Sequence, residues 1–326
     1  MDKNLLEIKN LRTTFSTIRG QAQAIRGLDL QIRENEILGI VGESGSGKSV
    51  TMKSVMGLLP RSAKVTADVF LYKGEDLRNK KEKQLQKYRG KEMAMIFQDP
   101  MTALNPLRTI GYHLIEVIRR YRRVSKAEAH KIAVEMLRQV GIPSPEARMK
   151  QYPHEFSGGM RQRVVIAMAL CCEPSLLIAD EPTTALDVTI QAQILDLLKQ
   201  LRQSRGMSVV LISHDMGVMA NMCHRIAVMY GGVLVEEGTV DEIFYHPQHP
   251  YTKDLLRSIP RPEATRGSKL QAIDGVPPAL HNMPKGCPFA TRCQYATERC
   301  LEEMPEIRVF SETQNAKCHL LAEKEA

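Results

Sequence analysis

The residues whose types and spacing are best suited to chemistry lie between Gly42 and Ser49. They have the spacing Gly-x4-Gly-Lys-Ser, which is that of a phosphate-binding loop. In such a loop the backbone N–H groups approach phosphate oxygens, Lys48 reaches the β- and γ-phosphates, and the Ser49 hydroxyl ligates Mg²⁺. The flanking residues predict a strand at 37–41 and a helix after the loop, so a merely connecting turn is the weaker interpretation. We expect the loop to bind a nucleoside triphosphate.

Two acidic residues follow a buried apolar run at 176–179. Asp180, at the end of that predicted strand, could hold Mg²⁺ directly or through water, and Glu181 could act as a general base that polarises the attacking water. A solvated loop is the alternative for an isolated Asp-Glu pair.

Ser157-Gly158-Gly159 opens a predicted helix whose N–H groups would form a second anion site, although an ordinary helix cap has the same sequence.

Composition narrows the class of protein. The chain has 326 residues and a net charge of +8, which suits phosphate ligands or an anionic membrane surface. Its longest apolar run, 164–172, is far shorter than the roughly 20 residues that span a bilayer. The N-terminus has no signal-peptide hydrophobic region, so we expect a cytosolic protein whose seven cysteines are reduced thiols or metal ligands.

The elements that must position these residues follow an α/β pattern. Residues 5–11 and 25–32 predict antiparallel strands, with a polar, flexible connection within 10–27. A strand is expected at 65–71 and a lysine-rich helix at roughly 79–91. Strands and helices then alternate to about residue 236, which favours a largely parallel sheet covered by helices.

The order of these motifs, together with Gln98, Asp187 and His214, resembles the ATP-binding cassette of ABC transporters over nearly all of residues 5–245. The resemblance implies an α/β nucleotide-binding domain with a RecA-like mixed sheet core, an antiparallel β subdomain and a helical insert at about 101–160. It also implies a cassette at 1–245 and a separate C-terminal extension at 246–326.

The resemblance assigns roles to matching positions. It implies that catalysis depends on Glu181, on His214 as the switch histidine and on Gln98 of the Q-loop. It implies that Mg²⁺ is held by Ser49, Gln98 and Asp180. The residues that it places around ATP are Phe15, Gly42, Ser44, Gly45, Ser46, Gly47, Lys48, Ser49, Val50, Ser157, Gly158, Gly159 and Asp187.

Phe15 and the two residues that flank the Ser-Gly-Gly of the signature motif need separate comment. Phe15 would stack on adenine, although an apolar strand residue is nearly as good an interpretation. In the signature motif, Phe156 stands where the family usually has Leu, and Met160 where it usually has Gln. The serine and both glycines remain, so we expect the site to work. ATP would lie between the loop of one cassette and the signature helix of a second, and its hydrolysis would open the dimer.

The C-terminal extension narrows the resemblance. HPYTKDLLRSIP, GVPP and CPFATRC are similar to the tails of ATPase subunits of oligopeptide, dipeptide and nickel importers, over about 246–318. This implies two transmembrane permeases, an extracytoplasmic peptide-binding protein, and a second homologous ATPase, with a heterodimer favoured over a homodimer. The expected place is the cytoplasmic face of the membrane. Nickel is an alternative substrate. A soluble ABC-type ATPase acting on nucleic acid or ribosomes is disfavoured, because the chain has one cassette and no coiled-coil insert.

Four cysteines gather in the extension with the spacing Cys-x5-Cys-x6-Cys-x17-Cys, at Cys287, Cys293, Cys300 and Cys318. This is not the paired Cys-x2-Cys pattern of zinc fingers. Four thiolates can hold an iron–sulfur cluster. A four-iron, four-sulfur cluster is favoured over zinc and over unligated thiols. The other cysteines, Cys171, Cys172 and Cys223, lie in apolar or helical stretches and are expected to be packing residues.

Overall fold

The computed structural model describes residues 3–18, 20–184, 186–259 and 273–321. The chain divides into two compact units. The first comprises residues 1–79 and 213–326, and the second comprises residues 80–212. Within the described residues, no helix is both long enough and apolar enough to cross a membrane.

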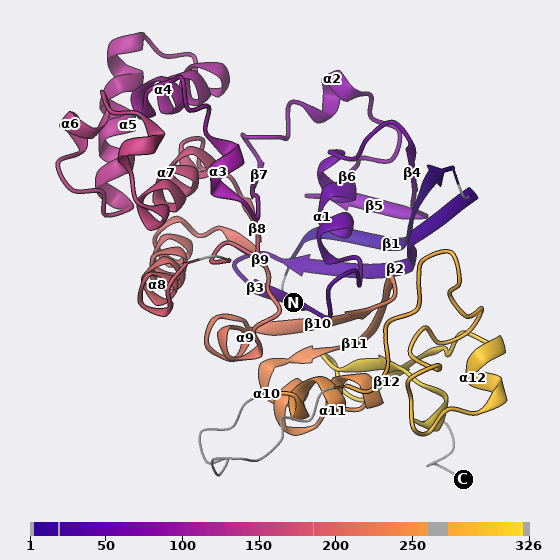
Figure 1. The fold of residues 1–326 in the computed structure, drawn as a ribbon. Helices are drawn as coiled ribbons and strands as arrows, with labels where there is room; N and C mark the ends of the chain where they lie inside the picture. Colours follow the sequence, from indigo (N-terminus) through magenta and orange to yellow (C-terminus); the bar gives the residue numbers. More distant parts are fainter. Residues whose placement is uncertain (1–2, 19, 185, 260–272, 322–326) are drawn as a thin grey trace. The chain divides into compact units, whose positions relative to one another are not determined.

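The first unit contains an antiparallel sheet in the order β2-β1-β5-β6, formed by β1 (Asn4–Thr17), β2 (Gly20–Arg33), β5 (Val69–Tyr72) and β6 (Glu75–Asp76). The short strand β4 (Ala63–Thr66) also pairs with β1 (Figure 1). The predicted strand at 65–71 is therefore divided between β4 and β5. Both pieces pair with β1, so the antiparallel character expected of this part of the chain is confirmed.

The flexible connection expected within 10–27 is wrong. β1 and β2 instead continue their antiparallel pairing almost to the turn, where Thr17 pairs with Gly20. The Thr17 hydroxyl donates to the Gly20 carbonyl and braces the turn. Thr13, Thr14 and Thr17 are β-branched, and such residues favour strands even where the sequence is polar.

A second sheet in this unit carries the phosphate loop. β3 (Ile37–Val41) is buried along its whole length and runs parallel to β10 (Arg225–Tyr230). β10 pairs in turn with the antiparallel strand β11 (Val233–Thr239). The loop leads from β3 into α1 (Lys48–Met56). α9 (Met216–Met222) also contacts β3.

The C-terminal extension is built onto this sheet. β13 (Asn315–Lys317) pairs with β11, and β12 (Ile307–Val309) pairs with β13. Figure 1 shows α10 (Val240–Tyr245) and α11 (Pro250–Arg257) beside β11. The remaining described elements are α12 (Glu298–Glu302) and a 3-10 turn at His319–Leu321. The extension thus shares hydrogen bonds with the strands that follow His214.

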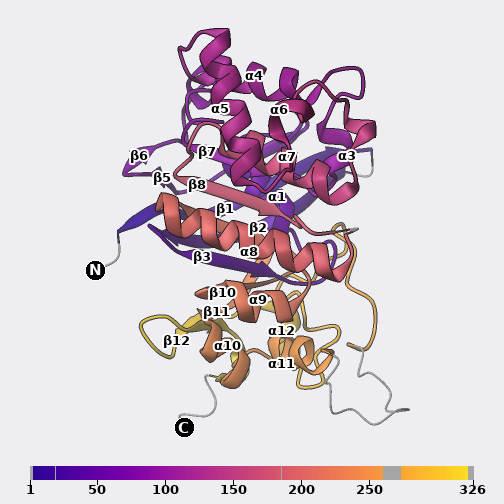
Figure 2. The same ribbon diagram turned by 90° about the vertical axis from the view of Figure 1, so that its left-hand side faces the viewer.

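The second unit has three parallel strands in the order β7-β8-β9, formed by β7 (Met93–Ile96), β8 (Leu176–Asp180) and β9 (Ser208–Ile212). β8 and β9 are wholly buried, as near-continuous apolar runs predict for parallel strands. α8 (Val188–Arg205) runs alongside β8 (Figure 2).

Helices dominate the rest of this unit. The main ones are α4 (Ile110–Tyr121), α5 (Lys126–Gln139) and α7 (Gly158–Leu170), which contact one another as one bundle (Figure 2). The shorter elements are α3 (Pro100–Ala103), α6 (Pro145–Arg148) and a 3-10 turn at Pro153–Glu155. Ser125 caps α5 by accepting a hydrogen bond from the Glu128 amide.

The helix expected at roughly 79–91 is largely wrong. Only α2 (Glu82–Leu85) forms, and none of its residues is buried. Most helical stability comes from burying an apolar face, and this lysine-rich segment has few apolar residues to bury. Gly90, with φ of 78°, ends the segment in a conformation outside the right-handed helix.

Candidate functional site

The phosphate loop has a shape that only glycine allows at two positions. Gly42 has φ of 148°, and a Cβ atom there would lie 2.1 Å from the Met229 carbonyl oxygen. Gly47 has φ of 103°, and its Cβ would lie 2.8 Å from Ile25 Cδ1. The loop therefore packs closely against Met229 and Ile25. It leads directly into the N-terminus of α1.

Lys48 is almost fully buried at the base of the loop. Its ammonium donates to the carbonyl oxygens of Gly42, at 2.7 Å, and Glu43, at 3.0 Å. Ser46 Oγ is also buried and has no hydrogen-bond partner among the described residues. A buried hydroxyl without a partner is costly unless a ligand completes it. The cation, the N-terminus of α1 and this hydroxyl together fit a triphosphate.

The other predicted residues of the loop occupy its rim. Ser44 and Gly45 are exposed, and Gly45 has open space around the position of a Cβ. Ser49 and Val50 are half-buried in the first turn of α1. The role of the Ser49 hydroxyl as a Mg²⁺ ligand stays a prediction from the loop spacing.

Gln98 and Glu181 meet in the second unit. Gln98 Nε2 donates to Glu181 Oε2 at 2.8 Å, and the Thr184 hydroxyl donates to the same oxygen at 2.9 Å. Glu181 has φ of 47°, an uncommon backbone conformation for a residue other than glycine. Such conformations cluster at functional sites, where the surrounding structure maintains them. Asp180, the preceding residue, is buried at the end of β8.

Thr184 was missed by the sequence interpretation. Its signal was available, because a threonine three residues after the proposed base can reach back to it in a turn. The Thr184 amide also donates to the Glu181 carbonyl, which closes that turn. Thr184 therefore orients the carboxylate without itself being placed at the reacting atoms.

The signature residues begin a helix, as predicted. Ser157 is exposed, and its hydroxyl accepts a hydrogen bond from the Met160 amide at the start of α7. A Cβ on Gly159 would lie 2.6 Å from Ile190 Cγ2 of α8, so glycine permits close packing of the two helices. Asp187 caps α8 by accepting from the Ile190 amide at 2.9 Å.

The unusual Phe156 is buried, with the Arg148 guanidinium 5.8 Å from the centre of its ring. The departure from the family pattern at this position is therefore accommodated in the interior. The next two residues, Ser157 and Gly158, are exposed.

Two predicted residues lie in the first unit away from the loop sequence. His214 is exposed and precedes Asp215, whose carboxylate caps α9. Phe15 is half-buried in β1, opposite Ala22 of β2 and Ala63 of β4. Its role beside adenine stays a prediction.

The four cysteines of the extension do not form a metal site in this geometry. Burial, with a smaller contribution from the nearby thiols of Cys318, Cys300 and Cys293, raises the pKa of Cys287 to about 12. Among the described residues, however, no three His, Cys, Asp or Glu side chains are placed so that they could hold a metal ion. The prediction of an iron–sulfur or zinc centre therefore receives no support from the structure.

The remaining cysteines are packing residues, as expected. Cys171 and Cys172 are buried after α7. Burial raises the pKa of both Cys171 and Cys223 to about 12, so these thiols stay protonated and unreactive near neutral pH.

Comparison with known proteins identifies two family regions. Residues 25–184 match the family described as ABC transporter. Residues 235–300 match the family described as oligopeptide/dipeptide transporter, C-terminal region. The second match covers the start of the extension and three of its four clustered cysteines.

Curated relatives match almost the entire chain. This chain is 52% identical over 319 residues to the dipeptide transport ATP-binding protein of Bacillus subtilis (strain 168), and the match covers 98% of this chain and 95% of the relative. This chain is also 54% identical over 318 residues to the oligopeptide transport ATP-binding protein of the same organism, and that match covers 97% of this chain and 89% of the relative. A solved dimeric structure of a bacterial ABC transporter cassette gives a TM-score of 0.65 at 30% identity, covering 72% of this chain and 98% of that one.

Proposed function

Because this chain belongs to the family of ABC transporter ATP-binding subunits with the oligopeptide/dipeptide C-terminal region, we propose that it powers the import of dipeptides or oligopeptides. Membership makes it an ATP-hydrolysing enzyme of mixed α/β fold. The observation that carries the proposal is the phosphate loop, with its two obligatory glycines, its buried lysine and the unpaired hydroxyl of Ser46.

The nucleotide would be gripped by the loop. The amides of Gly45 to Lys48 and the Lys48 ammonium would take the phosphates, with the N-terminus of α1 adding partial positive charge. Ser49, Gln98 and Asp180 offer a hydroxyl, an amide oxygen and a carboxylate, which is an oxygen donor set that suits Mg²⁺. When bound, Mg²⁺ would neutralise part of the phosphate charge.

Glu181 would act as the general base. Its carboxylate accepts hydrogen bonds from Gln98 and Thr184, and these bonds orient it. The carboxylate would take a proton from water as the water oxygen attacks the γ-phosphorus, and the bond to the bridging oxygen would break to release ADP and inorganic phosphate. His214, exposed at the start of the loop that precedes α9, would help to orient that water.

A second cassette would complete the site. The exposed N-terminus of α7, with Ser157 and Gly158, would bind the phosphates held by the loop of the partner cassette. ATP would then join two proteins, and hydrolysis would release them. We propose a related but different chain as the partner, together with two permeases and an extracytoplasmic peptide-binding protein. The complex would place this chain at the cytoplasmic face of the membrane.

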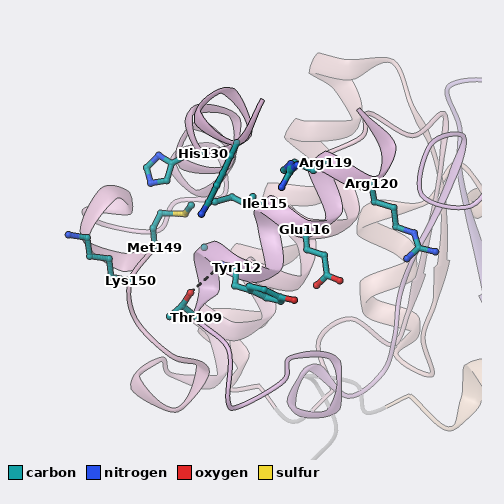
Figure 3. A pocket seen from close by; sticks show the side chains of 11 residues that line it. Thr109, Tyr112, Ile115, Glu116, Arg119, Arg120, His130, Met149 and Lys150 are labelled. Carbon is teal, nitrogen blue, oxygen red and sulfur yellow. Dashed lines mark hydrogen bonds between the residues drawn. The ribbon is translucent and has the colours of Figure 1, made fainter. Parts of the chain in front are cut away.

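A cavity of about 790 Å³ in the helical bundle offers a site for a permease (Figure 3). Ile115 and Met149 give it apolar surface. Its basic residues are Arg119, Arg120, Lys126 and Lys150, whereas Glu116 is its single acidic residue. This charge favours a cytoplasmic permease segment that combines apolar and acidic side chains.

Transport assays test the proposed function. The complex with its permeases would be reconstituted in vesicles with the binding protein, and ATP-dependent uptake of labelled dipeptides, longer peptides and Ni²⁺ would be compared. Peptide uptake that is abolished by Lys48→Ala supports the proposal. Uptake of Ni²⁺ without peptide uptake would contradict the peptide assignment, and normal ATP hydrolysis by Lys48→Ala would contradict the assignment of the loop.

The iron–sulfur hypothesis for the four cysteines rests on their spacing and on the resemblance alone. Iron and acid-labile sulfide would be measured in protein purified without oxygen. About four irons and four sulfides per chain, lost when Cys293 is changed to Ser, would support a cluster. Colourless protein with zinc or without metal would contradict it.

A further inference from the structure

Arg292 of the extension contacts a residue of the phosphate loop that the loop spacing leaves unspecified. Its guanidinium pairs with Glu43, the residue after Gly42, although 249 residues separate the two in the sequence. We propose that this pair is a clamp by which the C-terminal extension holds the phosphate loop in its ATP-binding conformation. Arg292 is then a positioning residue, and the inference rests on the proposed role of the loop.

The Arg292 side chain is only 3% exposed, and all five of its N–H donors have an acceptor. Two nitrogens reach both carboxylate oxygens of Glu43, at 2.5 and 3.1 Å. Nη1 also donates to the Tyr230 hydroxyl, Nη2 also donates to the Ile273 carbonyl, and Nε donates to the Asp274 carbonyl. Bidentate pairs of this kind are strong and directional, and breaking one leaves a buried charge unpaired.

Glu43 is held at three points, not one. Its carboxylate binds Arg292, its amide donates to the Tyr251 hydroxyl at 2.9 Å, and its carbonyl accepts from the Lys48 ammonium at 3.0 Å. The same residue therefore links the extension to the lysine that would bind the phosphates. A displacement of Glu43 would change the position of a carbonyl that orients Lys48.

The extension is itself firmly seated behind the loop. Phe289 is fully buried, and its ring centre lies 5.2 Å from that of Tyr230 and 5.3 Å from that of Tyr251. A Cβ on Gly231 would lie 2.6 Å from Pro288, so the backbone approaches closely here. The Cys287 amide donates to the Cys300 carbonyl and braces the segment against α12. Arg292 therefore reaches Glu43 from a packed segment.

If the Arg292–Glu43 pair keeps the phosphate loop ordered before ATP arrives, ATP should bind more tightly. A loop that must be ordered by its ligand costs conformational entropy, whereas a preorganised loop does not. Glu43 and Arg292 have no role in the chemical step as proposed. Loss of the pair should therefore raise the Kd and KM for ATP and change kcat little.

The test compares Arg292→Met and Glu43→Gln with the parent in the assembled transporter, by ATP titration and by steady-state hydrolysis. We expect a rise of about tenfold in Kd and KM, equivalent to about 1.4 kcal/mol, with kcat within about twofold. In the double variant the two effects should not add, because both remove one interaction. Arg299→Met is the matched control, since Arg299 pairs with Glu303 at the surface of the same extension and should bind ATP like the parent.

Parent-like Kd and KM in folded Arg292→Met, or a loss confined to kcat, would overturn the clamp. If Arg292→Met does not fold, Glu43→Gln decides alone, because it keeps the side-chain shape and removes only the charge. Effects that add in the double variant would also overturn it. These failures leave the loop assignment intact, since that assignment is tested separately by Lys48→Ala.

Discussion

Gln98 and Glu181, 83 residues apart, are joined by a hydrogen bond of 2.8 Å from the Gln98 amide to the Glu181 carboxylate. The bond connects the end of β7 with the end of β8, two neighbouring parallel strands. A residue proposed to hold Mg²⁺ thereby contacts the residue proposed to activate water. A change at Gln98 would therefore act directly on the carboxylate that we propose as the general base.

Replacing Glu181 with Gln should preserve ATP binding and lower hydrolysis by about 10²- to 10⁴-fold, because the amide cannot accept a proton. ATP affinity and turnover would be measured on the same preparation, and we expect a long-lived ATP-bound dimer in gel filtration. The control is Glu135→Gln, whose carboxylate pairs with Arg138 at the surface of α5. Turnover of Glu181→Gln at the parent rate would remove Glu181 from the mechanism.

Gly159→Ala should destabilise the protein by about 1–3 kcal/mol, because the added Cβ would overlap Ile190 Cγ2. Chemical denaturation would measure this change. The second substitution Ile190→Ala should restore part of the loss by opening space. Gly158→Ala is the control, since its Cβ would meet Leu186 at an ordinary 3.6 Å. Equal stability of the Gly159 and Gly158 variants would contradict the packing argument.

His249 should make stability depend on pH. Burial lowers the pKa of His249 to about 3 from 6.5, and its Nδ1 accepts a hydrogen bond from the Tyr251 amide. The unfolded chain therefore takes up a proton near pH 6.5 that the folded chain refuses, so this contribution to stability is lost as pH falls. Between pH 6.5 and 5 the loss should approach about 2 kcal/mol.

The measurement is the free energy of unfolding in urea at several pH values, for the parent and for His249→Gln. Other groups also titrate, so the parent and the variant are compared by the slope of the free energy of unfolding against pH. A shallower slope in His249→Gln supports the assignment. Identical slopes would show that His249 does not cause the dependence.

Reversing charge in the helical-bundle cavity should weaken binding of the permeases. Arg119→Glu combined with Arg120→Glu would repel an acidic segment, and we expect at least tenfold less copurification with the permeases from membranes. ATP hydrolysis by the isolated subunit should be unchanged. Lys131→Glu, an exposed change on α5 outside the cavity lining, is the control. Normal copurification of the double variant would place the permease elsewhere.

Local patterns were interpreted well. The strand, loop and helix around Lys48 depend on hydrogen bonds and glycine conformations within a few residues, and the same holds for the caps at Ser125, Ser157 and Asp187. The helix predicted at 79–91 forms only at Glu82–Leu85, where no residue is buried. β1 and β2 were underestimated because their pairing is stabilised across strands, not along one.

By itself, the sequence determined the phosphate loop, the order of the functional motifs and the family of the chain, because each depends on residue types at short, regular spacings. Only the tertiary structure decided that Gly159 must stay small, that Gln98 meets Glu181, and that Arg292 reaches Glu43 from the far end of the chain. The physical reason is that such contacts form through the packing of whole elements. No spacing along the chain encodes which distant side chains that packing will bring together.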